Sequence, residues 1–406
     1  MKISTRLKTG FSAVVAAGLA AASCAPALAR QPAFSSQRTD ATADGQTVVQ
    51  YTLRNSHGIE VRFLSLGGII TAIMTPDKNG NFANIVCGFP STGEYLTTGV
   101  ENRLHFGALI GRYANRIAKG KFTLDGQTWQ IPVNDPPNAI HGGPVGFDRH
   151  NWQVSRVSAP DGAVAARLTL VSPDGDQGFP GELTVSVTYT LNDKDQLLLH
   201  YTASTTKPTV VNLTNHTYFN LSGQPGHSIE QELLTIWGER WTPTDSTGIP
   251  TGTIEPVAGT SLDFQEETQL DTRLNAPSPL LTASRGLDAN WIINGPYGIA
   301  ARPAARLLDP ATGRMVSILS TQPGLQVFTG RGFGNGTVLP LSTQLRLPTD
   351  AIAFEPEHFP DSPNHPQFPS TTLLPGQWLN ETTAYQFTTL TGREGLSSPP
   401  AQAPAQ

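Results

Sequence analysis

The chain has 406 residues, a formal net charge of −5 and only 15% charged residues. It has no basic run or stripe that would follow a phosphate backbone, so we expect no nucleic-acid partner. The length allows one large all-β unit or two domains.

The N-terminus has the pattern of a secretory signal peptide over residues 1–29. A basic start within residues 2–8 precedes an apolar run at 11–22 and a small-x-small cleavage site ending at Ala29. The run is too short for a stable membrane anchor. We therefore expect an exported protein, periplasmic or secreted, with no membrane attachment beyond the export signal. A lipoprotein-processing site at Cys24 is the alternative, although the leucine usual at the start of that motif is absent.

Cleavage after Ala29 leaves Cys87 as the only thiol, so no intramolecular disulfide can form and stability must come from the core. We expect a linker over residues 30–44, a folded domain over residues 45–391 and a disordered tail, rich in Pro, Ala and Ser, over residues 392–406.

Alternation of apolar and polar residues predicts antiparallel strands. A hairpin is expected within residues 120–132 around Asp125-Gly126, and a second one pairs residues 183–191 with 197–203 around the turn at 192–195. No later segment shows a long helical period, and 39 Gly and 33 Pro punctuate short strands. These features predict an all-β fold, a large antiparallel β-sandwich.

Several separate segments offer side chains that suit the binding of hydroxyl groups. An Arg fork beside an Asn amide can grip vicinal hydroxyls or an anion, and a histidine before two glycines allows close approach of backbone to a ligand. An Asp near a Trp and a segment with two Gln amides, at 322 and 326, complete the set. Salt bridging or a surface turn is an open interpretation for each segment. The residues are Asn115, Arg116, His141, Asp288 and Gln326.

The run from Val210 to Leu221 is predicted as one strand with an almost wholly polar face. A face exposed only to water would more often carry Lys, Glu and Thr, whereas Asn, His and Tyr suit a concave surface that binds hydroxyls. A solvated face or a structural network is the alternative. The polar face carries Asn212, Thr214, His216, Tyr218 and Asn220.

The carboxylate-rich run 354–361 is predicted at a strand end or in a loop, because its prolines limit helix. If folding brings Glu355 to His216, the two form an acid–base pair for moving protons between oxygens of a small polar molecule. The Glu, His and Asp residues of this run could also bind a metal, but their spacing matches no zinc or facial iron site, so we expect none. Phosphate-loop and dinucleotide motifs are missing, and we expect no cofactor.

Together these segments resemble the aldose 1-epimerase (galactose mutarotase) family from about residue 45 to residue 390. The resemblance implies a galactose mutarotase-like β-sandwich with a pocket on one sheet. Its motifs are Gly-Arg-Tyr-Ala-Asn-Arg-Ile at 111–117, His-Gly-Gly at 141–143, Pro-Asp-Gly-Asp-Gln-Gly-Phe-Pro-Gly at 173–181, Asn-Leu-Thr-Asn-His-Thr-Tyr-Phe-Asn-Leu at 212–221 and Phe-Pro-Asp-Ser-Pro-Asn at 359–364.

Carried over position by position, the resemblance implies His216 as general acid and Glu355 as general base. The groups that would hold the sugar hydroxyls are Asn115, Arg116, His141, Tyr218, Asp288 and Gln326. The sequence departs from the family pattern at Leu287, Ala289, Glu357 and the loop 330–336, which bears on substrate preference more than on the reaction.

The implied activity interconverts the α and β anomers of aldohexoses such as glucose and galactose, with a small aldose as partner and a monomer or weak dimer as the assembly. It needs an ionised Glu355 and a charged His216, and we expect nearby carboxylates to keep His216 charged.

A non-catalytic sugar-binding protein, a hydrolase or lyase on larger glycans, and a sugar-phosphate epimerase are the alternatives. Retention of both His216 and Glu355 argues against the binder, and the low charge argues against the sugar phosphate.

Overall fold

The computed structural model describes residues 1, 31–101, 103–224, 226–284, 286–329 and 351–390. The predicted signal peptide, the predicted tail and the loop 330–336 lie outside the described residues. Among the helices of these ranges, none has the length and apolar character needed to cross a membrane.

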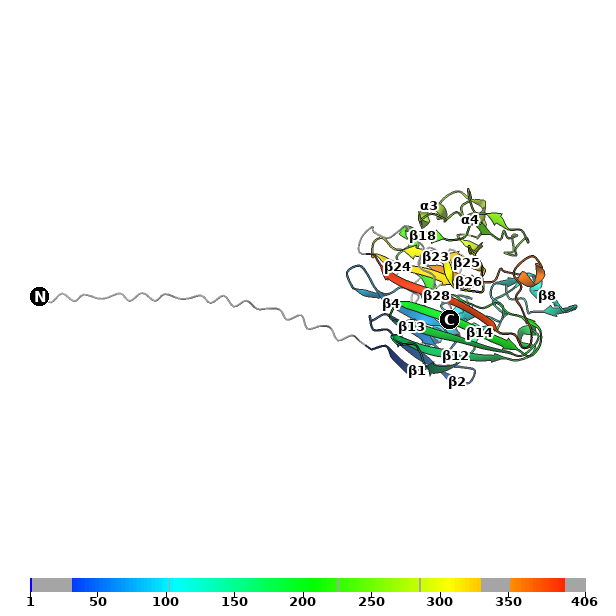
Figure 1. The fold of residues 1–406 in the computed structure, drawn as a ribbon, viewed down its shortest axis with the longest axis horizontal. Helices are drawn as coiled ribbons and strands as arrows, with labels where there is room; N and C mark the ends of the chain where they lie inside the picture. Colours follow the sequence, from blue (N-terminus) through cyan, green and yellow to red (C-terminus); the bar gives the residue numbers. More distant parts are fainter. Residues whose placement is uncertain (2–30, 102, 225, 285, 330–350, 391–406) are drawn as a thin grey trace.

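A nine-stranded antiparallel sheet forms one layer of the molecule (Figure 1). Its strands, in spatial order, are β11 (Gln153–Val157), β12 (Ala163–Ser172), β13 (Leu183–Asn192), β14 (Gln196–Thr205), β28 (Leu379–Thr389), β24 (Arg314–Ser320), β23 (Arg302–Leu308), β18 (Leu233–Ile236) and β21 (Thr268–Gln269).

Two further sheets supply the other side of the core. The five-stranded sheet contains β1 (Ala33–Ala43), β2 (Gln46–Arg54), β3 (Glu60–Leu64), β4 (Ile70–Pro76) and β5 (Phe82–Asn84). The six-stranded sheet contains, in spatial order, β17 (Tyr218–Phe219), β26 (Ile352–Glu357), β25 (Gly324–Thr329), β22 (Asp288–Ile292), β19 (Arg240–Trp241) and β20 (Glu255–Pro256).

Side chains from all three sheets meet in one large apolar cluster. Tyr189 of the nine-stranded sheet packs edge-on against Phe63 of the five-stranded sheet, with ring centroids 5.1 Å apart. Tyr385 of β28 packs in the same way against Phe219 of β17, at 5.3 Å. Burying apolar surface between facing sheets is the main stabilising contribution in such a fold. The predicted all-β antiparallel sandwich is confirmed.

Short elements join these layers. Small antiparallel pairs are formed by β6 (Leu109–Ile110) with β16 (Thr214–Asn215), β7 (Arg116–Ile117) with β10 (Ala139–Ile140), β8 (Lys121–Leu124) with β9 (Gln127–Gln130), and β15 (Thr209–Val210) with β27 (Thr372–Leu373). The helices are α1 (Thr92–Leu96), α2 (Thr98–Glu101), α3 (Leu270–Leu274) and α4 (Pro279–Ser284). In Figure 1, α3 and α4 lie beyond β18, away from β12.

Both predicted hairpins are confirmed, as β8–β9 and β13–β14. The predicted linker over 30–44 is wrong for residues 33–43, which form β1 and pair with β2. This strand lies at the edge of its sheet and most of its side chains are exposed, so backbone pairing holds it without the apolar alternation that the prediction required.

The single strand predicted over 210–221 is also wrong. The structure divides this run into β15, β16 and β17, which pair with three different partners, and residues 209–221 are buried throughout. A run that changes partner every few residues turns its side chains in several directions, so the period-two rule for one strand does not apply to it.

Candidate active site

Strand β26 carries the central carboxylates in a position that is buried on both faces. Ile352 and Phe354 pack into the large core, and Glu355 and Glu357 point to the opposite face. The prediction of a strand end or loop is wrong for Glu355, which lies inside β26 between β17 and β25. Proline limits helix but is compatible with a strand position that needs no N–H donor.

His216 faces Glu355 across the junction between β16 and β17. Its Nε2 atom lies 3.4 Å from Oε1 of Glu355. The backbone N–H of His216 donates to the carbonyl oxygen of Ala108 at 2.9 Å, and its ring stacks on Tyr218 with centroids 4.7 Å apart. These contacts fix the imidazole in place beside the carboxylate.

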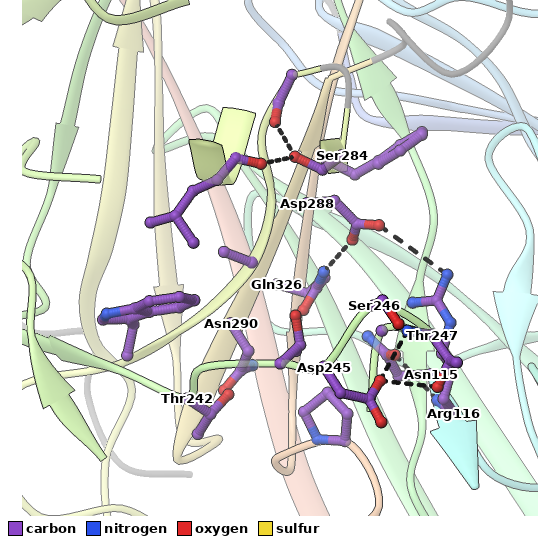
Figure 2. A pocket seen from close by; sticks show the side chains of 18 of the residues that line it. Asn115, Arg116, Thr242, Asp245, Ser246, Thr247, Ser284, Asp288, Asn290 and Gln326 are labelled. Carbon is purple, nitrogen blue, oxygen red and sulfur yellow. Dashed lines mark hydrogen bonds and ion pairs between the residues drawn. The ribbon is translucent and has the colours of Figure 1, made fainter. Parts of the chain in front are cut away.

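A polar row crosses the six-stranded sheet from Glu355. Gln326 of β25 is paired in register with Glu355 on one side and with Asn290 of β22 on the other. Cross-strand neighbours of this kind project from the same face. The Gln326 amide donates to Oδ1 of Asp288 at 2.6 Å, as Figure 2 shows.

The Asn115–Arg116 pair approaches this row from the side (Figure 2). Asn115 donates to Oε1 of Glu357 at 2.8 Å, and Nη2 of Arg116 lies 4.0 Å from Oδ2 of Asp288. The Arg116 Nε atom donates to Asp135 at 3.0 Å. Burial disfavours the Arg116 charge, but Asp288 and Asp135 outweigh that effect and raise its pKa. The Arg116 side chain is therefore always charged and lies between the carboxylates of Asp288 and Asp135.

His141 is tied to the same group through its backbone-facing nitrogen. The backbone N–H of Asn115 donates to His141 Nδ1 at 3.2 Å, and the His141 ring lies 5.5 Å from that of His216. Gly142, with φ +84°, passes so close to Gly111 that a Cβ would lie 2.2 Å from its carbonyl oxygen. Glycine is required there, which explains the His-Gly-Gly motif.

Three of these side chains could surround a metal ion. The donor atoms of His141, His216 and Glu355 lie within 4.8 Å of one another. A metal ligand needs a free nitrogen lone pair, however, and a His141 that accepts a hydrogen bond at Nδ1 carries its proton on Nε2. The hydrogen bond from Asn115 therefore favours a His141 that donates to a ligand oxygen over one that coordinates an ion.

A cavity of about 610 Å³ opens beside this group. Asn115, Arg116, Asp288 and Gln326 line it, so four of the eight predicted site residues reach it directly (Figure 2). The other four, His141, His216, Tyr218 and Glu355, are buried next to them and connect to them through the contacts above. The fold thus brings all eight together. The cavity volume falls within the range usual for small-molecule sites.

The electrostatics reverse the predicted resting charges. Burial, followed by the neighbouring His105, lowers the pKa of His216 to about 3. Burial, then Glu357 and Asp288, raises the pKa of Glu355 well above its usual value, against the opposing effect of Arg116. Burial also raises the pKa of Glu357 to about 8. The expectation that carboxylates keep His216 charged is wrong, because desolvation outweighs their attraction.

Several residues near the site were not predicted. His105 lies 3.0 Å from Asp148 through Nδ1, and its ring is 4.9 Å from His141 and 6.1 Å from His216. Asn290 lines the cavity. His105 stands in no sequence pattern that signals a site. Asn290 lies between Asp288 and Trp291 in a segment that was singled out, but only the pairing of β22 with β25 shows that its own side chain reaches the cavity.

The two arginines of the 111–117 motif have different surroundings. Arg112 is buried and donates to the backbone carbonyl oxygens of the 172–181 segment, including Ser172, Phe179 and Pro180. It holds this segment in place, while Arg116 lines the cavity. Arg112 therefore has a structural role, through hydrogen bonds to carbonyl oxygens and not through the salt bridging that was the alternative for this segment.

Comparisons with known proteins identify the family of the chain. The family model described as aldose 1-epimerase matches residues 49–386. The chain is similar to the galactose mutarotase of Mus musculus, with 39% identity over 84% of this chain and 95% of the relative. It is 34% identical to the aldose 1-epimerase of Escherichia coli over 85% of this chain and 96% of the relative. The crystal structure of galactose 1-epimerase from Lactobacillus acidophilus superposes with a TM-score of 0.77 and 27% identity, covering 88% of this chain and 99% of that one.

Proposed function

The chain belongs to the aldose 1-epimerase family and interconverts the α and β anomers of aldoses, and we propose that His216 and Glu355 carry the protons that move in this reaction. The observation that carries the proposal is the 3.4 Å approach of His216 Nε2 to Glu355 Oε1, with both side chains buried. Aldohexoses, including the galactose named for the mammalian relatives, are the proposed substrates.

The reaction needs only one exchangeable proton on the His216–Glu355 pair, and it starts with that proton on His216. Glu355 takes the proton of the anomeric hydroxyl as the C1–O5 bond breaks, and O5 takes a proton from the His216 imidazolium. Rotation about C1–C2 presents the other face of the aldehyde, and ring closure returns both protons. The enzyme ends as it began, and each proton transfer accelerates the reaction by about 10²–10⁴-fold.

The resting pair stores this proton on Glu355, since the pKa of Glu355 is raised and that of His216 is lowered. The working form is the tautomer with the proton on His216. Arg116 favours it, because its positive charge lowers the pKa of Glu355. Asn115, Arg116, His141, Tyr218, Asp288 and Gln326 supply donors and acceptors for the sugar hydroxyls, and Tyr218 also stacks on the His216 ring.

Polarimetry tests the proposal directly. Freshly dissolved α-D-galactose and α-D-glucose should approach their equilibrium rotation faster with the purified protein, and Glu355→Gln should abolish most of the acceleration. Acceleration that persists in this variant would reject Glu355 as the base.

We also propose that the chain is exported to the periplasm or the medium and acts as a monomer or weak dimer. The basic start, apolar run and Ala-Leu-Ala site support export. N-terminal sequencing of protein from fractionated cells should begin at Arg30, and protein retained with its Met1 in the cytoplasm would contradict export. Size-exclusion chromatography tests the assembly.

A further inference from the structure

The wall of the cavity opposite Arg116 holds a buried amide that the proposed mechanism does not use. Asn290 is 2% exposed, and within the described residues neither Oδ1 nor Nδ2 has a hydrogen-bond partner. Asn290 lines the cavity, and Figure 2 shows it next to Thr242 and below Gln326. A buried amide with both ends unpaired costs free energy, and a bound polar group that pairs with it would offset this cost.

The neighbouring strand leaves room for this amide. Gly324 of β25 lies beneath it, and a Cβ at that position would be 2.8 Å from Nδ2 and 3.0 Å from Oδ1 of Asn290. Gly324 has no positive φ that would require glycine, so the space, and not the backbone, explains the missing side chain. Thr242 directly follows β19, and its backbone N–H donates to the carbonyl oxygen of Asn290 at 3.0 Å. Its hydroxyl is also buried without a partner among the described residues.

Register places this amide across the cavity floor from the acid–base pair. Glu355, Gln326 and Asn290 occupy one row on three adjacent strands, and strands lie about 4.8 Å apart, so the outer two backbones are separated by roughly 10 Å. A pyranose ring over Gln326, with its anomeric carbon at Glu355, would direct the ring atom opposite C1 toward Asn290. That atom is C4.

We propose that Asn290, assisted by Thr242, binds the C4 hydroxyl of the aldose and so determines which sugars are accepted. Its amide offers both a donor and an acceptor, so it pairs with a hydroxyl in either configuration at C4 and tolerates glucose as well as galactose. A sugar without this hydroxyl leaves the amide unpaired and is disfavoured. This role rests on the proposed function and adds a second contact region to it.

The test is a cycle of protein and substrate changes read by polarimetry. Wild type, Asn290→Ala and the exposed control Asn79→Ala are assayed with D-glucose, 2-deoxy-D-glucose and 4-deoxy-D-glucose. Asn290→Ala should lower kcat/KM about 10- to 100-fold for the first two sugars. With 4-deoxy-D-glucose the kcat/KM of wild type should already be low, and Asn290→Ala should lower it little further. Asn79→Ala should match wild type throughout.

The outcomes separate the two proposals. If folded wild type accelerates none of the sugars, the proposed function fails. If wild type is active but Asn290→Ala loses the same factor with all three sugars, or none, the role of Asn290 at C4 is wrong and the function stands. If the alanine variant does not fold, the measurements are repeated with Asn290→Asp, which keeps the size of the side chain and an acceptor oxygen. Its decrease in kcat/KM should again be smaller with 4-deoxy-D-glucose than with the other two sugars.

Discussion

The Nε2 atom of His216 and the Oε1 atom of Glu355 lie 3.4 Å apart in a buried region, although 139 positions separate them in the sequence. The pair holds one exchangeable proton, and the surrounding groups decide where it rests. Burial works against charge on both side chains, so the neutral imidazole and the protonated carboxyl form the resting state. In the proposed mechanism this proton first moves to His216, and the sugar then exchanges protons with both side chains.

Removing either member of the pair should remove most turnover. His216→Asn and Glu355→Gln are each expected to lower kcat for D-galactose by at least about 100-fold, because each removes one proton-transfer group, with a smaller change in KM. Polarimetry measures kcat and KM of both variants beside two exposed controls, His57→Asn and Glu182→Gln. A near-normal kcat in either site variant would refute the assignment.

The pH dependence of kcat/KM should be wider than unperturbed groups would give. Below about pH 3 His216 becomes protonated while Glu355 also carries a proton. Glu355 then cannot accept the proton of the anomeric hydroxyl. Above the raised pKa of Glu355 the pair loses its only proton, so O5 has no donor. The low limb is expected near pH 3 and the high limb at the raised pKa of Glu355, well above the usual value of a glutamate. A narrow optimum between about 4.3 and 6.5, the unperturbed values, would show that burial does not control the pair. Circular dichroism at each pH separates this effect from unfolding.

The two arginines of the 111–117 motif should separate binding from stability. Arg116→Met is expected to raise KM about 10- to 100-fold, because it removes a charged hydrogen-bond donor from the cavity. Arg112→Met should instead lower the free energy of unfolding by about 1–3 kcal/mol, because buried carbonyl oxygens lose their donor, and should leave KM of the folded protein unchanged. Urea titration and steady-state kinetics on both variants decide the matter. The reverse pattern would contradict the assignment.

Metal removal should leave the activity intact. The Asn115 N–H occupies the Nδ1 lone pair of His141, so the third ligand of a His141–His216–Glu355 site is not free. Dialysis against EDTA is expected to keep kcat/KM within about twofold, and the measurement is repeated after adding Zn²⁺ or Mg²⁺. Loss on chelation with recovery on addition would establish a metal requirement.

A second buried carboxyl should make stability depend on pH. Burial raises the pKa of Glu381 to about 8, and Gln322 donates to it at 2.6 Å. The carboxyl of Glu381 has a pKa of about 4.3 in the unfolded state. Between about pH 4.3 and pH 8 the folded state therefore keeps a proton that the unfolded state has lost, and the free energy of unfolding falls as the pH rises. Glu381→Gln should flatten the decline of the free energy of unfolding between pH 5 and 9 by more than about 1 kcal/mol. The exposed control Glu239→Gln should keep the wild-type slope, and an unchanged slope in Glu381→Gln would overturn the expectation.

The strand-rich class, the two hairpins and the identities of the side chains suited to acid–base chemistry follow from the sequence alone. Alternation at 183–191 and the Asp125-Gly126 turn act locally, so a single sequence reports them. The motifs that resemble the aldose 1-epimerase family indicated the residues of the site, and the matching family model and relatives show the same membership.

The arrangement and the charge of those residues depend on long-range packing. Backbone pairing without an apolar pattern makes a strand of residues 33–43, and changes of partner divide residues 209–221 into three pieces. His216 and Glu355 are both buried, and the rings around His216 come from distant parts of the sequence, including His105 and Phe328. The pKa values of the pair could therefore not be derived from residue types. The same holds for Arg112, which anchors carbonyl groups, and for Asn290, whose amide faces the cavity. Long-range packing sets desolvation and the direction of side chains, and neither is encoded in local spacing.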